Sequence, residues 1–145
     1  MLQKNSLICV SVFLMGILTL ACSSNKAETT QTAKTDPDKL GPEVSIQTVA
    51  AMKGQEGVIV LDVREPSEYQ KIHIPGVTLI PKGEALSRKS EYINFKTVFV
   101  TCRSGNRSNH IVKKLRAQGY LNVHNMKGGL KAWRSANLPL KSASK

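Results

Sequence analysis

The chain has 145 residues, which is room for one domain of ordinary size and little more. Hydrophobic residues make up 41% and aromatic residues 5%, a composition that excludes collagen-like and wholly disordered chains. The formal net charge is +11, and from residue 82 onward fourteen Lys and Arg residues face only Glu84 and Glu91, so small anions, anionic lipid surfaces or nucleic acid are favoured as partners.

Residues 1–21 have the pattern of a signal peptide. Lys4 supplies a short positive region, and residues 7–21 carry no charge, a run too short to span a membrane comfortably. The run ends Leu-Thr-Leu-Ala-Cys at Cys22, which resembles the lipobox of bacterial lipoproteins. This resemblance implies cleavage before Cys22, lipidation of Cys22, and a place in the cell envelope. We expect the periplasmic face of the outer membrane, with a soluble periplasmic product or an uncleaved anchor as the alternatives.

Cleavage and lipidation would leave only one of the three cysteines as a free thiol. Cys9 would leave with the signal peptide and Cys22 would carry lipid, so Cys102 would be the single thiol of the exported domain. The compartment is oxidising, but a domain with one cysteine can form no internal disulfide. It also cannot form a metal site that needs several cysteines. Cys102 is therefore either an inert core residue or a thiol whose reactivity is used.

Residues 22–42 are rich in Ser, Thr, Ala, Lys and Asp, and this composition predicts a flexible tether. A single domain is expected over residues 43–142, with short apolar runs alternating with amphipathic segments. This alternation predicts an α/β fold with a parallel central sheet and helices on both faces. The expected strands are 58–63, 77–80, 97–101 and 122–125. The expected helices are 45–52, 66–69, 84–93, 106–118 and 129–136.

The chemistry is expected in the loop that joins the strand 97–101 to the helix 106–118. Cys102 stands at the carboxyl end of that strand, where parallel sheets place their ligands. Gly105 lets the backbone curl so that N–H groups converge on an anion, and the following helix adds its positive end. Such a cradle favours the thiolate form of Cys102 and makes it nucleophilic near neutral pH. The expected substrate-binding residues of the loop are Arg103, Ser104, Gly105, Asn106, Arg107 and Ser108.

Four stretches of the chain together resemble the rhodanese (sulfurtransferase) family, in that family's order, over residues 43–140. The active-site loop has the family's four residues between Cys102 and Arg107. The other three stretches are Asp-Val-Arg at 62–64, His-Ile-Pro-Gly at 73–76, and Gly-Gly-Leu-Lys-Ala-Trp at 128–133. Ile72 stands where the family often has glycine, and Glu65 and Glu68 stand where some members have a second substrate-binding arginine.

The resemblance implies a sulfur transfer in two steps. Cys102 would take the outer sulfur of a small anionic donor such as thiosulfate, and a thiophilic acceptor, cyanide or a thiol, would then remove it. Arg103 and Arg107 would hold the donor's oxyanion, and no cofactor or metal is required. The alternative is a persulfide carrier, or a module that docks on another envelope protein. Cysteine phosphatases are disfavoured because they place five residues between cysteine and arginine.

The remaining polar residues receive supporting roles. Asp62 and Arg64 are expected to connect neighbouring loops, with substrate contact by Arg64 as the alternative, and His73 is expected to be a hydrogen-bonded turn residue. The basic residues 113, 114 and 116 form either a solvated face or a surface that steers anions toward Cys102. Nucleic-acid binding is disfavoured because the basic residues lack interleaved aromatic side chains.

Overall fold

A computed structural model describes residues 39–142. The predicted signal peptide, Cys22 and the tether up to residue 38 lie outside the described residues. Five parallel strands form one sheet in the order β1-β5-β4-β2-β3. The strands are β1 (Glu43–Val44), β2 (Val58–Asp62), β3 (Thr78–Leu79), β4 (Thr97–Thr101) and β5 (Val123–Met126).

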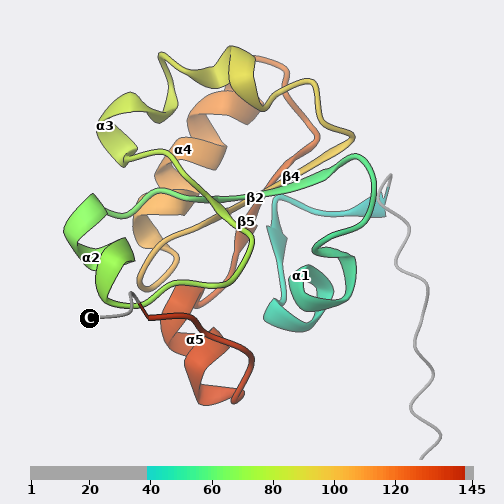
Figure 1. The fold of residues 1–145 in the computed structure, drawn as a ribbon. Coiled ribbons are helices and arrows are strands. Elements are labelled where there is room, and N and C mark those ends of the chain that lie inside the picture. Colours follow the sequence, from blue (N-terminus) through green and yellow to red (C-terminus); the bar gives the residue numbers. More distant parts are fainter. Residues whose placement is uncertain (1–38, 143–145) are drawn as a thin grey trace, which may run out of the picture. The chain divides into compact units, whose positions relative to one another are not determined.

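Within residues 39–142, the helices α1 to α5 and the short 3-10 helix η2 flank the sheet, and Figure 1 shows α3 and α4 above it and α1 and α5 below it. The α-helices are α1 (Ile46–Met52), α2 (Pro66–Lys71), α3 (Lys82–Ala85), α4 (Asn106–Ala117) and α5 (Gly129–Ser135), and the 3-10 helix is η2 (Lys89–Glu91). Helices on both faces explain why β4 is buried along its whole length. The predicted fold class is confirmed.

Two hydrophobic clusters lie on opposite faces of the sheet because alternate strand residues point to opposite sides. Val98 and Val100 of β4 pack with the α4 residues Ile111 and Leu115. Phe99, between them, packs in the other cluster, which also contains the α5 residue Trp133. The centre of the sheet is thus fixed from both sides, and the ends of its strands provide a rigid base for loops.

The prediction of one continuous helix over 84–93 is wrong, because the structure ends α3 at Ala85 and begins η2 at Lys89. The Ala85 carbonyl, which a continuing helix would use for its next backbone bond, accepts a hydrogen bond from the buried Tyr92 hydroxyl instead. Such a side-chain bond competes with helix formation.

The other elements agree with the predicted ones to within one or two residues, except at the ends of the sheet. Strand β1 was not predicted, and β3 is shorter than the predicted strand 77–80. Leu40 already packs against the second cluster, so packed chain begins three residues before the expected domain boundary. Among residues 39–142, no helix combines the length and the apolar character that crossing a bilayer requires.

Candidate active site

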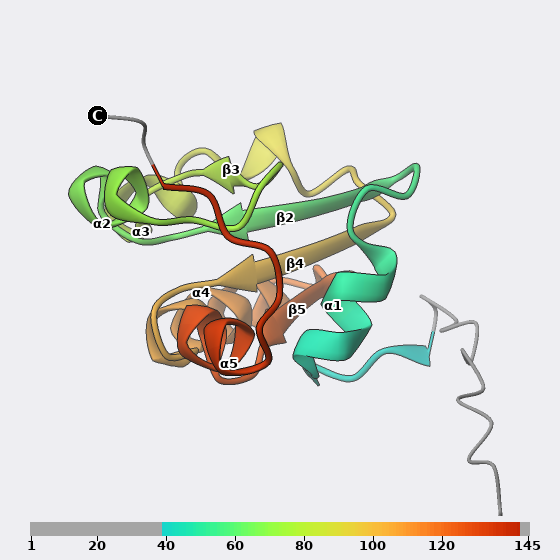
Figure 2. The same ribbon diagram turned by 60° about the horizontal axis from the view of Figure 1, so that its bottom comes forward.

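Cys102 lies directly after β4 and before α4, at the carboxyl edge of the sheet. Figure 2 shows the arrows of β2 and β4 pointing toward the side where α2 lies. The Cys102 side chain is a free thiol and its residue is 1% exposed. Its Sγ accepts a hydrogen bond from the Gly105 N–H at 3.2 Å and lies 3.5 Å from the Ser108 hydroxyl. The expected cradle is therefore present around the sulfur.

The cradle changes the acidity of the thiol. Burial raises the pKa of Cys102, but the Ser108 hydroxyl and the N–H groups of Ser104, Gly105 and Ser108 outweigh it, and the net pKa lies below the ordinary value of 9.0. Because these donors bind an anionic sulfur better than a neutral thiol, they stabilise the thiolate. Cys102 is thus buried, yet its thiol is more acidic than an ordinary cysteine, and this environment is typical of a nucleophilic cysteine.

Gly105 makes the curl of the loop possible. Its φ is +92°, in the left-handed region that favours glycine, and it caps the start of α4. A Cβ at this position would lie 3.1 Å from the Gly128 nitrogen, so the space is also restricted.

Helix α5 supports the loop from behind. The Leu130 N–H donates to the Cys102 carbonyl at 2.8 Å, and the Lys131 N–H donates to the Arg103 carbonyl at 2.9 Å. These are first-turn N–H groups of α5, which have no partner inside the helix. Gly129 permits this contact, because a Cβ there would lie only 2.4 Å from the Cys102 carbonyl oxygen. The Gly-Gly segment at the start of α5 therefore also shapes the loop that carries Cys102.

A polar chain that sequence reasoning missed connects Ser108 to β1. The Ser108 Oγ lies 2.6 Å from Asn125 Oδ1, and the Asn125 amide nitrogen donates to a Glu43 carboxylate oxygen at 3.0 Å. The Ser108 hydroxyl has one proton, so Asn125, Cys102 and the Gly105 carbonyl, which lies 3.1 Å from the Ser108 Oγ, compete for it. The signal in the sequence was a polar residue, Asn125, inside a short strand whose residues are all buried.

Arg107 is held by a partner that the sequence did not predict. Its two terminal nitrogens donate to the two Glu68 carboxylate oxygens at 2.6 and 2.8 Å. This bidentate bond lowers the pKa of Glu68 to about 2 and, with the charge and hydrogen bond of Cys102, raises the pKa of Arg107. Glu68, noted only as a departure from the family pattern, thus links α2 to the active-site loop and neutralises one of the two arginines expected to bind the donor.

Arg103, Ser104 and Asn106 lie on the exposed side of the loop. Among residues 39–142, Arg103 has no carboxylate within ion-pair distance, so its charge is available to an anion. Within the described residues, Arg107 is therefore paired with a carboxylate and Arg103 is not.

Asp62 and Arg64 form a buried ion pair, 1% and 3% exposed, with a shortest distance of 2.7 Å. The Arg64 guanidinium also donates to the carbonyls of Glu68 at 3.3 Å and Ile72 at 2.8 Å. These contacts connect the end of β2 to the middle and the C-terminal end of α2, which is the geometry of a residue that ties neighbouring segments together.

His73 lies in a turn beside α2. Its Nδ1 is 2.9 Å from the Tyr69 carbonyl oxygen, its ring stacks on the Tyr69 ring at 4.0 Å, and its backbone pairs with Lys141. These contacts are those of a hydrogen-bonded turn residue. Arg116, from the basic run, donates to the carbonyls of Leu121 and Val123 and so serves the fold, while Lys113 and Lys114 are exposed.

Within the described part of the chain, no group of three or more His, Cys, Asp or Glu side chains is arranged to hold a metal ion. The chemistry that this site offers is that of a single activated thiol surrounded by hydrogen-bond donors.

The described residues form a parallel α/β sheet with one cysteine, Cys102, in a donor-rich loop that a glycine pair supports. This chain belongs to the rhodanese-like domain family, which it matches over residues 45–136.

Similar proteins carry names that refer to sulfur chemistry. A putative sulfur carrier protein of Bacillus subtilis is 37% identical over 93 residues, which are 63% of this chain and 50% of that protein. A sulfurtransferase of Allochromatium vinosum is 36% identical over 85 residues, 59% of this chain and 79% of that protein. The chain spans between half and three fifths of the length of the first curated relatives that it matches.

Solved structures share the fold. A rhodanese-related protein from Thermoplasma volcanium superposes with a TM-score of 0.61 at 25% identity, covering 70% of this chain and 98% of the other. A thiosulfate sulfurtransferase from Pseudomonas aeruginosa gives a TM-score of 0.61 at 27% identity, covering 71% of this chain and 20% of the other.

Proposed function

We propose that this protein is a sulfurtransferase that moves sulfane sulfur from a small anionic donor such as thiosulfate to a thiophilic acceptor, cyanide or a thiol. The observation that carries the proposal is the position of Cys102 Sγ among convergent donors that lower the pKa of its thiol. Relatives named as sulfurtransferases support it.

In the first step the Cys102 thiolate attacks the outer sulfur of thiosulfate. The S–S bond of the donor breaks, sulfite leaves with that bond's electron pair, and Cys102 keeps the transferred sulfur as an anionic persulfide. Arg103 attracts the donor, and the N–H groups of the loop hold the negative charge before and after transfer. In the second step the acceptor attacks the outer sulfur, and Cys102 departs as thiolate.

The experiment is thiosulfate:cyanide turnover by the wild-type protein and by Cys102→Ser, with the persulfide measured by mass spectrometry. Turnover that depends on Cys102 supports the enzyme, and equal activity of the two proteins would overturn it. Persulfide formation without turnover would favour a carrier. That second function is supported by the burial of Cys102 and by the relative named a sulfur carrier.

We further propose that the chain is exported and anchored through lipid on Cys22. The proposal rests on the uncharged run of residues 7–21 and its end at Ala-Cys. A lipid-modified cysteine with more than one acyl chain would hold the protein at a membrane. Expression with a labelled fatty acid tests it: label in the wild-type protein and none in Cys22→Ser is expected, and an unlabelled wild-type protein would refute anchoring.

A further inference from the structure

Asn125 is a buried polar residue that the sulfur-transfer steps described above do not use. It lies on β5, between β1 and β4, and is 1% exposed. Its amide nitrogen donates to the Glu43 carboxylate at 3.0 Å, and its Oδ1 lies 2.6 Å from the Ser108 Oγ. Because burying a polar side chain costs free energy, an amide one hydroxyl away from the Cys102 sulfur is a candidate for a functional role.

The two partners fix the direction in which the Asn125 amide faces. A carboxylate only accepts hydrogen bonds, so the NH2 group must face Glu43 and Oδ1 must face Ser108. Oδ1 also only accepts, so the proton between the two oxygens must come from the Ser108 hydroxyl. The alternative acceptor, the Gly105 carbonyl, is farther away at 3.1 Å. The bond to Asn125 is therefore the one that the single Ser108 proton makes first.

Cys102 needs the same proton only when its sulfur is charged. A neutral thiol can donate its own S–H to the Ser108 oxygen, 3.5 Å away, while Ser108 still donates to Asn125. A thiolate has no proton and is a charged acceptor, so the Ser108 hydroxyl turns toward it. That turn breaks the bond to Asn125 and leaves two unprotonated oxygen lone pairs facing each other. Asn125 therefore makes the thiolate less favourable than the loop alone would.

The persulfide resembles the thiol in this respect. After sulfur transfer the negative charge lies on the outer sulfur, and Sγ is bonded to two atoms and is only a weak acceptor. The Ser108 hydroxyl then returns to Asn125, because a neutral amide oxygen is the better acceptor of the two.

We infer that Asn125, oriented by Glu43, is a positioning residue that keeps the Ser108 hydroxyl turned away from the catalytic sulfur while that sulfur is a thiol or part of a persulfide. Only the thiolate attracts the hydroxyl strongly enough to break the bond to Asn125. The effect on the persulfide rests on the proposed function, whereas the effect on the thiol does not. Asn125 thus limits the stability of the free thiolate and favours the form of the protein that carries sulfur.

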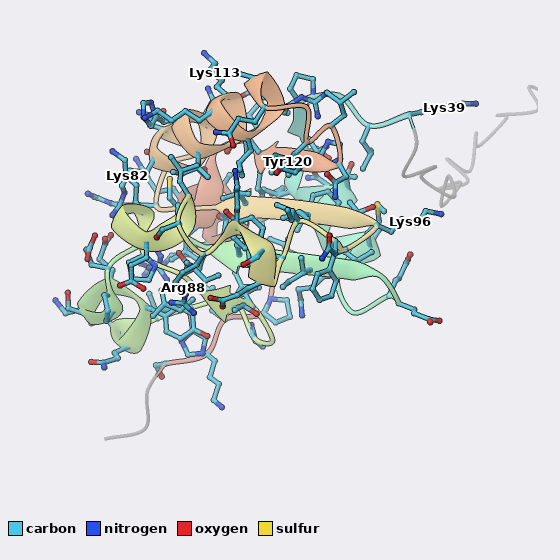
Figure 3. All side chains as sticks on the ribbon, turned by 90° about the horizontal axis from the view of Figure 1, so that it is seen from above. Lys39, Lys82, Arg88, Lys96, Lys113 and Tyr120 are labelled. Atoms are coloured by element: carbon cyan, nitrogen blue, oxygen red, sulfur yellow. The ribbon has the colours of Figure 1, made fainter. Side chains whose placement is uncertain are left out.

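The charged groups around these side chains are unchanged by a substitution of Asn125. The thiol interacts with the Arg107 guanidinium of α4, which Glu68 of α2 binds, and Arg103 follows it in the loop. At the other end, the Glu43 carboxylate lines a hollow with two cations of α4, Lys113 and Arg116, the first of which Figure 3 labels. A shift in the pH profile of an Asn125 variant therefore reports the hydroxyl proton and not a change of charge.

The first test measures the rate of alkylation at Cys102 by iodoacetamide against pH, with the labelled site located by peptide mapping. Asn125→Leu keeps the approximate size of the side chain and removes its acceptor. Burial raises the pKa of Cys102, and the Ser108 hydroxyl is the strongest of the groups that lower it. We expect the midpoint of the profile to fall in Asn125→Leu by about 0.5–1 pH unit, the equivalent of one hydrogen bond. An unmoved or raised midpoint would overturn the inference.

A double-mutant cycle shows whether Asn125 acts through Ser108. The proton in question is absent from Ser108→Ala, so adding Asn125→Leu to that variant should move the midpoint by less than about 0.2 pH unit. A shift as large as the one in the wild-type background would overturn the inference, because Asn125 would then act on the thiol by another route.

Asn122→Leu is the matched control for a loss of stability. The Asn122 amide directly precedes β5 and donates to two carbonyls, those of Ile93 and Phe95. Its loss should lower the midpoint of urea denaturation and leave the alkylation midpoint in place. An alkylation shift equal to that of Asn125→Leu would overturn the inference, since any weakening of the fold would then have the same effect.

Glu43→Gln tests the orientation of the amide at an exposed position, so it decides the matter even where Asn125→Leu does not fold. The glutamine amide can donate as well as accept, so Asn125 is no longer held with its Oδ1 toward Ser108. We expect the alkylation midpoint to fall, by less than in Asn125→Leu. An unmoved or raised midpoint would overturn the inference.

The persulfide supplies the test that depends on the proposed function. Protein loaded with thiosulfate is mixed with cyanide, which attacks the outer sulfur; the S–S bond breaks, Cys102 leaves as thiolate with its electron pair, and thiocyanate departs. Because a more stable thiolate leaves faster, thiocyanate release from Asn125→Leu should be about two- to threefold faster than from the wild type. Equal or slower release would overturn the effect on the persulfide. A wild-type protein that takes up no sulfur would overturn the proposed function, and the alkylation midpoints would still decide the role of Asn125.

Discussion

The pair formed by Glu68 and Arg107 gives a prediction in which stability and reactivity move in opposite directions. The change is Glu68→Gln, which keeps the shape of the side chain and removes its charge. In the folded protein the carboxylate is bonded to Arg107 through both oxygens, with 31% and 30% of the two side chains exposed. The pair connects α2 to the start of α4. Its loss should therefore lower the stability of the folded protein and also change the charge near the active-site loop.

The magnitude follows from the acidity of Glu68. Its pKa falls from 4.5 to about 2, chiefly through the hydrogen bond from Arg107, and a fall of that size corresponds to roughly 3 kcal/mol. Partial exposure screens the pair, so we expect Glu68→Gln to lower the free energy of unfolding by about 1–2 kcal/mol at pH 7. Because the folded pKa lies below the unfolded one, this contribution is complete above the unfolded value near 4.5 and is lost as the pH falls through about 2.

Urea denaturation between pH 7 and pH 3 measures this contribution. The midpoint of the variant should lie about 0.5–1 M below that of the wild type at pH 7, and the gap should narrow to about half at pH 3. Glu56→Gln is the matched control, because Glu56 is exposed and makes no ion pair within residues 39–142. A difference in the free energy of unfolding below about 0.3 kcal/mol at pH 7, or a difference that does not change with pH, would refute the reasoning.

The same variant leaves Arg107 without its carboxylate. Its full charge then adds to that of Arg103 near the thiol, so kcat/KM for thiosulfate should rise about threefold at low salt and the gain should shrink at high salt. A fall in kcat/KM would show instead that Glu68 is needed to orient Arg107 for the donor.

Three further changes test separate parts of the structure. Gly129→Ala should cost about 3 kcal/mol in urea denaturation, because its Cβ would lie 2.4 Å from the Cys102 carbonyl oxygen at a φ of +57°; a loss below about 0.5 kcal/mol would contradict the close contact. Ser108→Ala should raise the pKa of Cys102, seen as a shift to higher pH in the rate of alkylation by iodoacetamide, and an unmoved profile would place the hydroxyl proton elsewhere. Burial lowers the pKa of His124, so stability should decline as the pH falls below about 6.5 and the decline should be smaller in His124→Gln; parallel curves would exclude this residue as the cause.

The sequence was most informative where local pattern and tertiary structure agree. The apolar run that ends at Thr101 is buried on both faces, and Gly105 has the positive φ that the expected loop requires. These features depend on residues close together in the chain. The position of Cys102 at a strand end could therefore be predicted without knowledge of any distant contact.

The contacts between distant segments could not be predicted in the same way. Glu68 and Arg107 are 39 residues apart, and Asn125 and Glu43 are 82 apart. Nothing in the local pattern says which carboxylate meets which cation or amide, because sheet order decides it. Strand β1 is two residues long and is defined by its pairing with β5, so it too carries no periodic signal.

The central claim is that Cys102 is a thiolate that carries sulfur. The most direct measurement is mass spectrometry of the protein after brief exposure to thiosulfate, with peptide mapping to locate any added sulfur. We expect one additional sulfur atom on Cys102, which cyanide removes and which is absent from Cys102→Ser. A wild-type protein that gains no sulfur, or gains it at another residue, would contradict it.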